Sequence, residues 1–153
     1  MTDIGFQEAD MTEAFQWQRR VGFGDCDPAG IAYTGTLSNL ALEALDVFWE
    51  EMLDGKGWYR MNTEYGFGMP FVHMEMDFKA PVIPGTPLVF SVAPEAVGRS
   101  SVRLHLSAEQ GGVLRFTASF VSVFVTTPGM EKIPVPEIVR AALARRFGPD
   151  AGI

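Results

Sequence analysis

The stretch that decides the fold is residues 37–52, which read LSNLALEALDVFWEEM. Apolar side chains recur in it at intervals of three and four residues, the period of an α-helix with one buried face. The members of this stripe are Leu37, Leu40, Ala41, Ala44, Leu45, Phe48, Trp49 and Met52. Thr34 or Thr36 is suited to capping the helix start, and Gly55 to ending the helix. Because the stripe is broad and contains two aromatic residues, we expect this helix to lie across a β-sheet.

Five strand-like segments flank the predicted helix, and most alternate between apolar and polar residues. They are residues 15–24, 72–78, 88–92, 102–106 and 113–126. Arg19 breaks the alternation in the first segment, and the third ends near Pro94. Gly111-Gly112 predicts a hairpin, and a second helix is expected from Pro136. One long helix on a five-stranded, mainly antiparallel sheet is an α+β arrangement, called a hotdog fold when the sheet curves around the helix. Such a sheet has an edge strand to protect, so we expect pairing into a dimer.

Length and composition limit the class of protein. A chain of 153 residues fits one domain, and we expect a flexible leader at residues 1–13 and a single domain over residues 14–148. The net charge of −7 argues against nucleic acid as a partner. Every longer apolar stretch is interrupted by charges, and the N-terminus does not resemble a signal peptide, so no membrane contact and a cytoplasmic location are expected.

The cysteine and histidine content argues against a metal site and against a disulfide. The lone Cys26 excludes an internal disulfide, and its flanking carboxylates disfavour a nucleophilic thiolate. Neither His73 nor His105 stands in a metal-ligand spacing. We therefore expect no metal.

The main chemical candidate is Asp27, within residues 23–31, FGDCDPAGI. Pro28 and Gly30 place Asp27 on a tight turn, between a predicted strand and the start of the predicted helix. A helix start presents free backbone amides, and a carboxylate beside such donors is suited to attack on a polarised carbonyl. The same pattern is also ordinary turn chemistry, in which the aspartate side chain satisfies the backbone. Spacing alone leaves both interpretations open.

Other segments have two interpretations each. Glu43 and Asp46 lie on the predicted helix and either reach a pocket along its flank or belong to a solvated face. Arg99, Ser100 and Ser101 form either an exposed hairpin tip or a clamp for a phosphate-bearing ligand. Residues 55–69 form a glycine-rich loop whose aromatic side chains indicate a pocket wall, lid or subunit contact, or a cluster packed under the loop.

The sequence resembles the 4-hydroxybenzoyl-CoA thioesterase family of hotdog enzymes. The long motif FGDCDPAGI, residues 23–31, is similar to the signature of that family. Looser similarities are VHMEMDFKAPVIPGTPLVFSV (72–92), EAVGRSSVRLHL (95–106) and KIPVPEIVRAAL (132–143). Together they cover nearly the whole chain from about residue 15 to residue 145.

The resemblance implies roles for particular residues. It makes Asp27 the catalytic carboxylate and places the amide that holds the thioester carbonyl near Thr34. It also implies that Arg99, Ser100 and Ser101 contact coenzyme A, which is part of the substrate, so that no cofactor is needed. The family forms homodimers with active sites between subunits, and often homotetramers. The sequence departs from the family at residues 33–37, where Tyr33 would flank the acyl group, so the acyl group stays open.

The expected function is therefore hydrolysis of an aromatic, hydroxybenzoyl-like, or short acyl-CoA thioester to free acid and CoA. Asp27 would act as nucleophile or as general base, a choice that the sequence leaves open. One alternative is a thioesterase of aliphatic acyl-CoA that uses Glu43 on the helix. Another is an acyl-CoA binding module without turnover.

Overall fold

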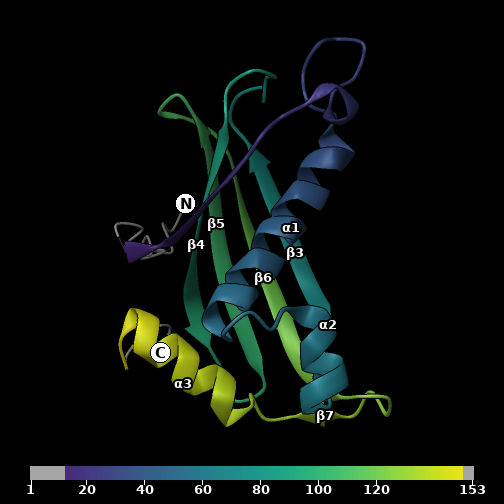
Figure 1. The fold of residues 1–153 in the computed structure, drawn as a ribbon, viewed down its shortest axis with the longest axis vertical. Helices are drawn as coiled ribbons and strands as arrows, with labels where there is room; N and C mark the ends of the chain where they lie inside the picture. The colour runs from purple at the N-terminus through teal and green to yellow at the C-terminus, as the bar shows by residue number, and fades with distance from the viewer. Residues whose placement is uncertain (1–12, 150–153) are drawn as a thin grey trace, which may run out of the picture.

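The structure, a computed structural model, describes residues 13–149. The predicted leader, residues 1–13, lies outside the described residues except for Glu13. The described chain folds as one curved β-sheet, with the long helix α1 (Thr34–Met52) along one face and α3 (Glu137–Phe147) near one end (Figure 1). The predicted α+β hotdog arrangement is confirmed.

The sheet is antiparallel throughout, and β1 and β3 form its two edges in the described chain. Its long strands, in order across the sheet, are β1 (Phe15–Arg19), β4 (Leu88–Val97), β5 (Ser101–Gln110), β6 (Val113–Thr126) and β3 (Phe71–Phe78). These are the five predicted strands. Two further strands pair with the end of β6, namely β2 (Phe67–Gly68) and β7 (Lys132–Ile133). With two residues each, β2 and β7 are too short to show an alternating pattern.

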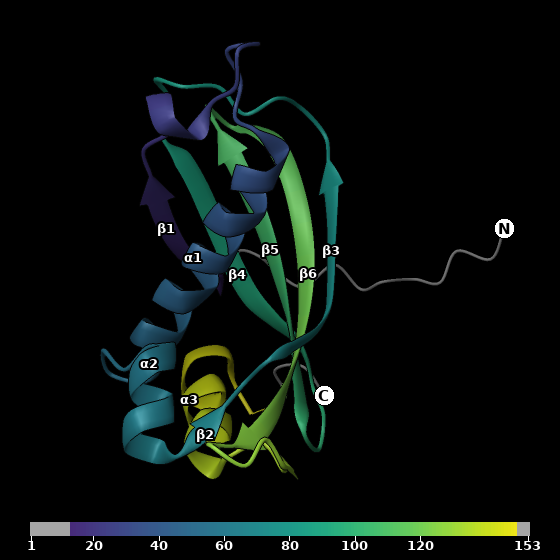
Figure 2. The same ribbon diagram turned by 90° about the vertical axis from the view of Figure 1, so that its right-hand side faces the viewer.

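Helix α1 is held by its apolar stripe. All eight predicted stripe residues are buried, and α1 runs along the sheet (Figure 2). Phe48, fully buried, packs edge-on against Phe15 of β1 and against Trp49, with ring centroids 5.8 and 5.1 Å apart. Burying one such side chain contributes about 1.5–3 kcal/mol, so the stripe fixes the helix firmly on the sheet.

The segment before α1 differs from the prediction. Strand β1 ends at Arg19 rather than near Gly24, and η2 (Phe23–Asp25) is a 3-10 turn. The cause is a local hydrogen bond, because the Gly22 amide donates to the Asp25 carboxylate at 2.9 Å and bends the chain. A local turn therefore replaces the end of the predicted strand.

The start of α1 also differs from the prediction. Tyr33, and neither Thr34 nor Thr36, is the N-cap residue, and it makes no side-chain cap hydrogen bond. Its amide donates to the Asp25 carbonyl at 2.9 Å, so backbone pairing rather than a threonine hydroxyl sets where the helix begins. Gly55 follows the helix end as predicted, with φ of 84° and an amide donating to a carbonyl of the last turn at 2.6 Å.

Residues 55–69 contain two helical segments where a loop was predicted. They are α2 (Trp58–Arg60) and η3 (Met61–Tyr65). The side chains of Asn62 and Thr63 donate to backbone carbonyls four residues earlier, at 2.8 and 3.0 Å. Glycines on both sides obscured these short helical turns in the sequence.

The other predicted turns agree with the structure, with one extension. Strand β4 continues past Pro94, where a bulge before Ala96 lets the ladder pass a residue without an amide hydrogen. Gly111 and Gly112 turn β5 into β6 with φ of 57° and 77°, and α3 begins directly after Pro136. Among residues 13–149 no helix is long and apolar enough to cross a membrane.

Candidate active site

Asp27 lies on a closed turn and is half-buried. The Ala29 amide donates to Asp27 Oδ1 at 2.8 Å, and the Gly30 amide donates to the Asp27 carbonyl at 2.9 Å. The Asp27 amide in turn donates to the Ile31 carbonyl at 2.9 Å. Among the described residues, only the Ala29 amide donates to the Asp27 carboxylate. The side chain therefore shapes its own turn and retains a second oxygen for chemistry.

The base of this turn lies next to the start of α1. Cys26 and Ala32 form an antiparallel bridge, and Thr34, the first residue of α1, follows two positions later. The first amides of a helix have no acceptor within it, so they are available to a carbonyl oxygen. The Tyr33 ring lies against this first helical turn, because a Cβ added to Gly35 would be only 2.8 Å from Tyr33 Cε1. The structure thus brings Asp27, Tyr33 and Thr34 to one end of α1.

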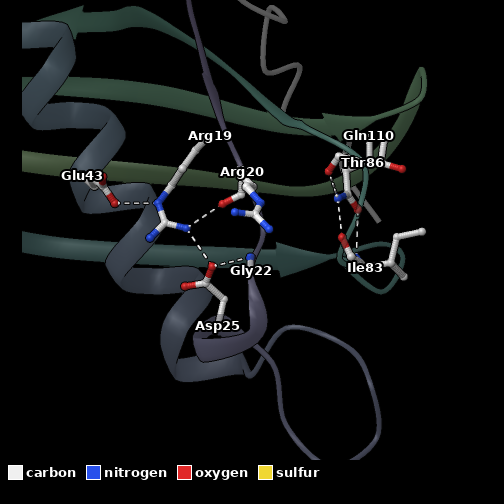
Figure 3. Close-up of polar contacts among 8 residues, drawn as sticks. All are labelled: Arg19, Arg20, Gly22, Asp25, Glu43, Ile83, Thr86 and Gln110. Carbon is white, nitrogen blue, oxygen red and sulfur yellow. Dashed lines mark hydrogen bonds and ion pairs between the residues drawn. The ribbon is translucent and has the colours of Figure 1, made fainter.

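Asp25 has a different role from Asp27. Its Oδ2 accepts hydrogen bonds from the Gly22 amide and from Arg19 Nη1, both at 2.9 Å (Figure 3). The hydrogen bond from Gly22, and then the one from Arg19, hold the pKa of the Asp25 carboxyl below its ordinary value. A carboxylate this firmly occupied is a structural element of the turn.

Arg19 joins this turn to α1. Its Nε donates to Glu43 Oε2 at 3.0 Å while its Nη1 donates to Asp25 and to the Arg20 carbonyl (Figure 3). Sequence reasoning did not assign this role. The available signal was a cation at the fifth position of β1, on the same face as Phe15 and Trp17.

A cavity with a volume of about 550 Å³ lies along the flank of α1. It lies between α1, the α2–η3 segment, the start of β3 and the end of β6. Its lining residues are Leu42, Glu43, Leu45, Asp46, Trp49, Trp58, Asn62, Gly68, Met69, Pro70, Phe71, Val125, Thr127 and Met130. Most of this lining is apolar or aromatic, which suits the acyl part of a ligand.

The carboxylates of the cavity are those of Glu43 and Asp46, and Asp27 is not in its lining. Glu43 is held by Arg19, and Asp46 Oδ1 accepts a hydrogen bond from the Trp58 amide at 3.2 Å. Asp46 thereby ties α2 to α1. Both residues therefore reach the cavity, as one interpretation predicted, while the Glu43 side chain is also exposed, as the other predicted.

Arg99, Ser100 and Ser101 lie at the other end of the molecule from Asp27, where β4 turns into β5 beside α3 (Figure 1). The Arg99 carbonyl accepts the Val135 amide at 2.8 Å, and the exposed Arg99 side chain projects from this turn. Arg140 of α3 donates to the carbonyls of Gly98 and Arg99 and fixes the turn. A single chain therefore does not bring this turn and the Asp27 turn together.

Comparison with known proteins gives one family. The family described as the thioesterase-like superfamily matches residues 21–143 of this chain. A 1,4-dihydroxy-2-naphthoyl-CoA hydrolase of Nostoc punctiforme is 30% identical over 131 residues, which are 83% of this chain and 85% of that protein.

Solved structures agree with this similarity. A thioesterase superfamily protein from Jannaschia sp. CCS1 is 40% identical with a TM-score of 0.84, and the match covers 87% of this chain and 92% of that one. A 1,4-dihydroxy-2-naphthoyl-CoA thioesterase from Synechocystis is 23% identical with a TM-score of 0.73, covering 86% and 96%. The second likeness shows the shared fold.

Proposed function

Because the chain belongs to the thioesterase-like superfamily, we propose that it hydrolyses an acyl-CoA thioester to a free acid and CoA. The observation that carries the proposal is the Asp27 turn, closed by the Cys26–Ala32 bridge directly before the free amides of α1. The names of relatives, such as the Nostoc punctiforme 1,4-dihydroxy-2-naphthoyl-CoA hydrolase, support an acyl-CoA substrate. The cytoplasm remains the expected location, on sequence grounds alone.

In the proposed reaction, the thioester carbonyl accepts a hydrogen bond from an amide of the first turn of α1, with Thr34 as the expected donor. This hydrogen bond stabilises the oxyanion that forms when the carbonyl carbon is attacked, by roughly 3 kcal/mol if it acts like other oxyanion donors. Asp27 either removes a proton from the attacking water or attacks the carbon itself to form a mixed anhydride. In both routes the carbon–sulfur bond breaks and CoA leaves as its thiol after protonation. In the second route a water molecule then hydrolyses the anhydride, which releases the free acid and restores the Asp27 carboxylate.

The acyl group is proposed to be aromatic and hydroxylated. Trp49, Trp58 and Phe71 are among the residues that line the cavity, and the cavity volume of about 550 Å³ exceeds what a short acyl chain needs. The carboxylates of Glu43 and Asp46 provide acceptors for phenolic hydroxyl groups. Tyr33, beside the first turn of α1, is proposed to contact the acyl group, and Arg99, Ser100 and Ser101 to contact CoA.

The proposed assembly is a homodimer with shared active sites, and a pair of such dimers is the expected tetramer. The edge strand β3 exposes Phe71, Val72, Met74 and Phe78 by 44%, 61%, 50% and 51%. An apolar edge of this kind is suited to pairing with a second copy of itself. One end of β3 borders the cavity, and the other lies near the start of α1 (Figure 2). Antiparallel pairing of two copies of β3 would therefore bring the Asp27 turn of one chain toward the cavity of its partner.

A thiol-release assay over a panel of acyl-CoA substrates tests the proposal. Hydroxybenzoyl-CoA and hydroxynaphthoyl-CoA are expected to be cleaved faster than acetyl-CoA. Tight binding of these substrates without release of CoA would instead identify a binding module. Single turnover in oxygen-18 water tests the anhydride route, since label enters Asp27 only when water attacks the Asp27 carbonyl carbon of the anhydride.

A second candidate uses Glu43 as the catalytic carboxylate, and the observation in its favour is that Glu43, unlike Asp27, lines the cavity. Against it, one Glu43 oxygen is already held by Arg19 at 3.0 Å. Asp27→Asn and Glu43→Gln, assayed separately, distinguish the two readings. Loss of turnover in Glu43→Gln with full turnover in Asp27→Asn would favour the second candidate.

A further inference from the structure

The Arg19 side chain is the centre of a hydrogen-bond network that takes no direct part in the proposed reaction. Its side chain is 28% exposed and stands on the inward face of β1, beside the aromatic residues of that strand. The guanidinium reaches three segments at once, with contacts of 2.9 Å to Asp25, 3.0 Å to Glu43 and 3.0 Å to the Arg20 carbonyl (Figure 3). It thereby connects the end of β1, the η2 turn and the middle of α1.

The contact with Asp25 reaches both sides of the Asp27 loop. Asp25 lies two residues before Asp27. The backbone carbonyl of Asp25 accepts the amide of Tyr33, the residue that precedes Thr34, at 2.9 Å. A contact that holds Asp25 in place therefore also holds the Asp27 turn and the start of α1 relative to each other.

The contact of Arg19 with Glu43 also holds the Asp27 turn against helix α1. Glu43 is nine residues beyond Thr34 on the same rigid helix, so the guanidinium holds the turn from a second point. The planar fork of arginine binds two carboxylates in a set geometry, which the flexible ammonium of lysine does not reproduce. Both contacts stabilise the charged form of arginine, and the hydrogen bond to Asp25 is the main cause of the raised pKa of Arg19.

Stability alone does not account for this arrangement. The Glu43 side chain is 48% exposed, and ion pairs at such exposure contribute little to stability. Misplacing a reacting group by about 1 Å, in contrast, costs up to about a hundredfold in rate. The contact of Arg19 with Glu43 thus affects the geometry of the site more than the stability of the fold.

We infer that Arg19 is a positioning residue, which holds the Asp27 turn in register with the start of α1 through its simultaneous contacts with Asp25 and Glu43. The inference rests on the proposed hydrolysis at Asp27. Arg19 itself is not among the residues that line the cavity.

The test compares Arg19→Met and Arg19→Lys with Arg20→Met in steady-state assays on a hydroxyaryl acyl-CoA. Arg20 is the matched control, an exposed neighbour whose side chain makes no hydrogen bond or ion pair among the described residues. We expect kcat to fall about tenfold or more in Arg19→Met and less in Arg19→Lys, with KM changed less than about threefold. Arg20→Met should retain wild-type values.

A double variant completes the test. If Arg19 acts through Asp25, then Arg19→Met combined with Asp25→Asn should lose no more kcat than the worse single variant. Additive losses, an unchanged kcat in folded Arg19→Met, or a rise in KM alone would overturn the inference. A wild-type protein that releases no CoA from any substrate would instead contradict the proposed function. Thermal unfolding of each variant, followed by circular dichroism, separates misfolding from these outcomes.

Discussion

Gln110 offers a sharp test of how the structure supports the Asp27 turn. It is fully buried at the end of β5, and its side-chain amide makes three hydrogen bonds to the loop before β4 (Figure 3). Nε2 donates to the carbonyls of Ile83 and Thr86 at 2.7 and 2.8 Å, and Oε1 accepts the Ile83 amide at 3.0 Å. In the same loop, the Val82 carbonyl accepts the amide of Ala32, which closes the Asp27 turn, at 2.8 Å.

Gln110→Met keeps the volume of the side chain and removes all three hydrogen bonds. Each net hydrogen bond contributes about 0.5–1.5 kcal/mol, and water can reach part of the loop because Ile83 is 38% exposed. We therefore expect the free energy of unfolding to fall by about 2–4 kcal/mol, which lowers Tm by about 5–15 °C in a domain of this size.

Urea unfolding at one fixed protein concentration measures this loss, since any oligomer adds a concentration-dependent term. Gln18→Met is the matched control, because Gln18 is exposed on β1 and its change should stay within about 0.5 kcal/mol. Hydrogen exchange at the Ala32 amide should accelerate in Gln110→Met and not in the control. A Gln110→Met protein as stable as the control, with unchanged exchange at Ala32, would refute the reasoning.

Three further predictions address the turn, the dimer and the acyl site. Because the pKa of Asp25 is lowered in the folded state, its charged form stabilises the fold above the unfolded pKa of about 4. Asp25→Asn should therefore lower the free energy of unfolding by about 1–3 kcal/mol at pH 7. Urea unfolding at several pH values should show this loss shrinking as the pH falls through the folded pKa. Met74→Lys places a charge on the exposed edge of β3, so sedimentation should show monomers. These monomers should show little hydrolysis in a thiol-release assay. An active monomer would contradict active sites shared between subunits. Gly35→Ala should displace the Tyr33 ring without loss of stability, because alanine favours the helix. The ratio of kcat/KM for hydroxybenzoyl-CoA to kcat/KM for acetyl-CoA should change by about tenfold. An unchanged ratio would show that Tyr33 does not contact the acyl group.

The fold was predictable because its signals are periodic and local. The stripe of α1 repeats with helical period over 16 residues, 37–52, and all eight of its members are buried as predicted. The Gly111-Gly112 hairpin and the start of α3 after Pro136 are marked by residues with strong backbone preferences. The match to the thioesterase-like superfamily confirms the predicted family and the predicted class of enzyme, a thioester hydrolase.

The site was predictable only in part. The Asp27 turn is encoded by neighbouring residues, notably Pro28 and Gly30, and was located correctly. The cavity was not predictable in detail, because its walls come from segments as distant in sequence as Leu42 and Met130. The same holds for the start of α1, where pairing with Asp25 overrides the cap preference of threonine. The roles of Asp27 and Thr34 in catalysis stay predictions.

The most direct measurement of the central claim is the single-turnover rate of acyl-CoA hydrolysis in Asp27→Asn. Asparagine keeps the size of the side chain and its hydrogen bond with the Ala29 amide, so the turn should persist while the base or nucleophile is lost. Asp54→Asn, in the exposed turn after α1, is the control, since asparagine tolerates the φ of 53° found at this residue. We predict a loss of about a hundredfold or more for Asp27→Asn and none for Asp54→Asn. Near wild-type hydrolysis by Asp27→Asn would contradict the account.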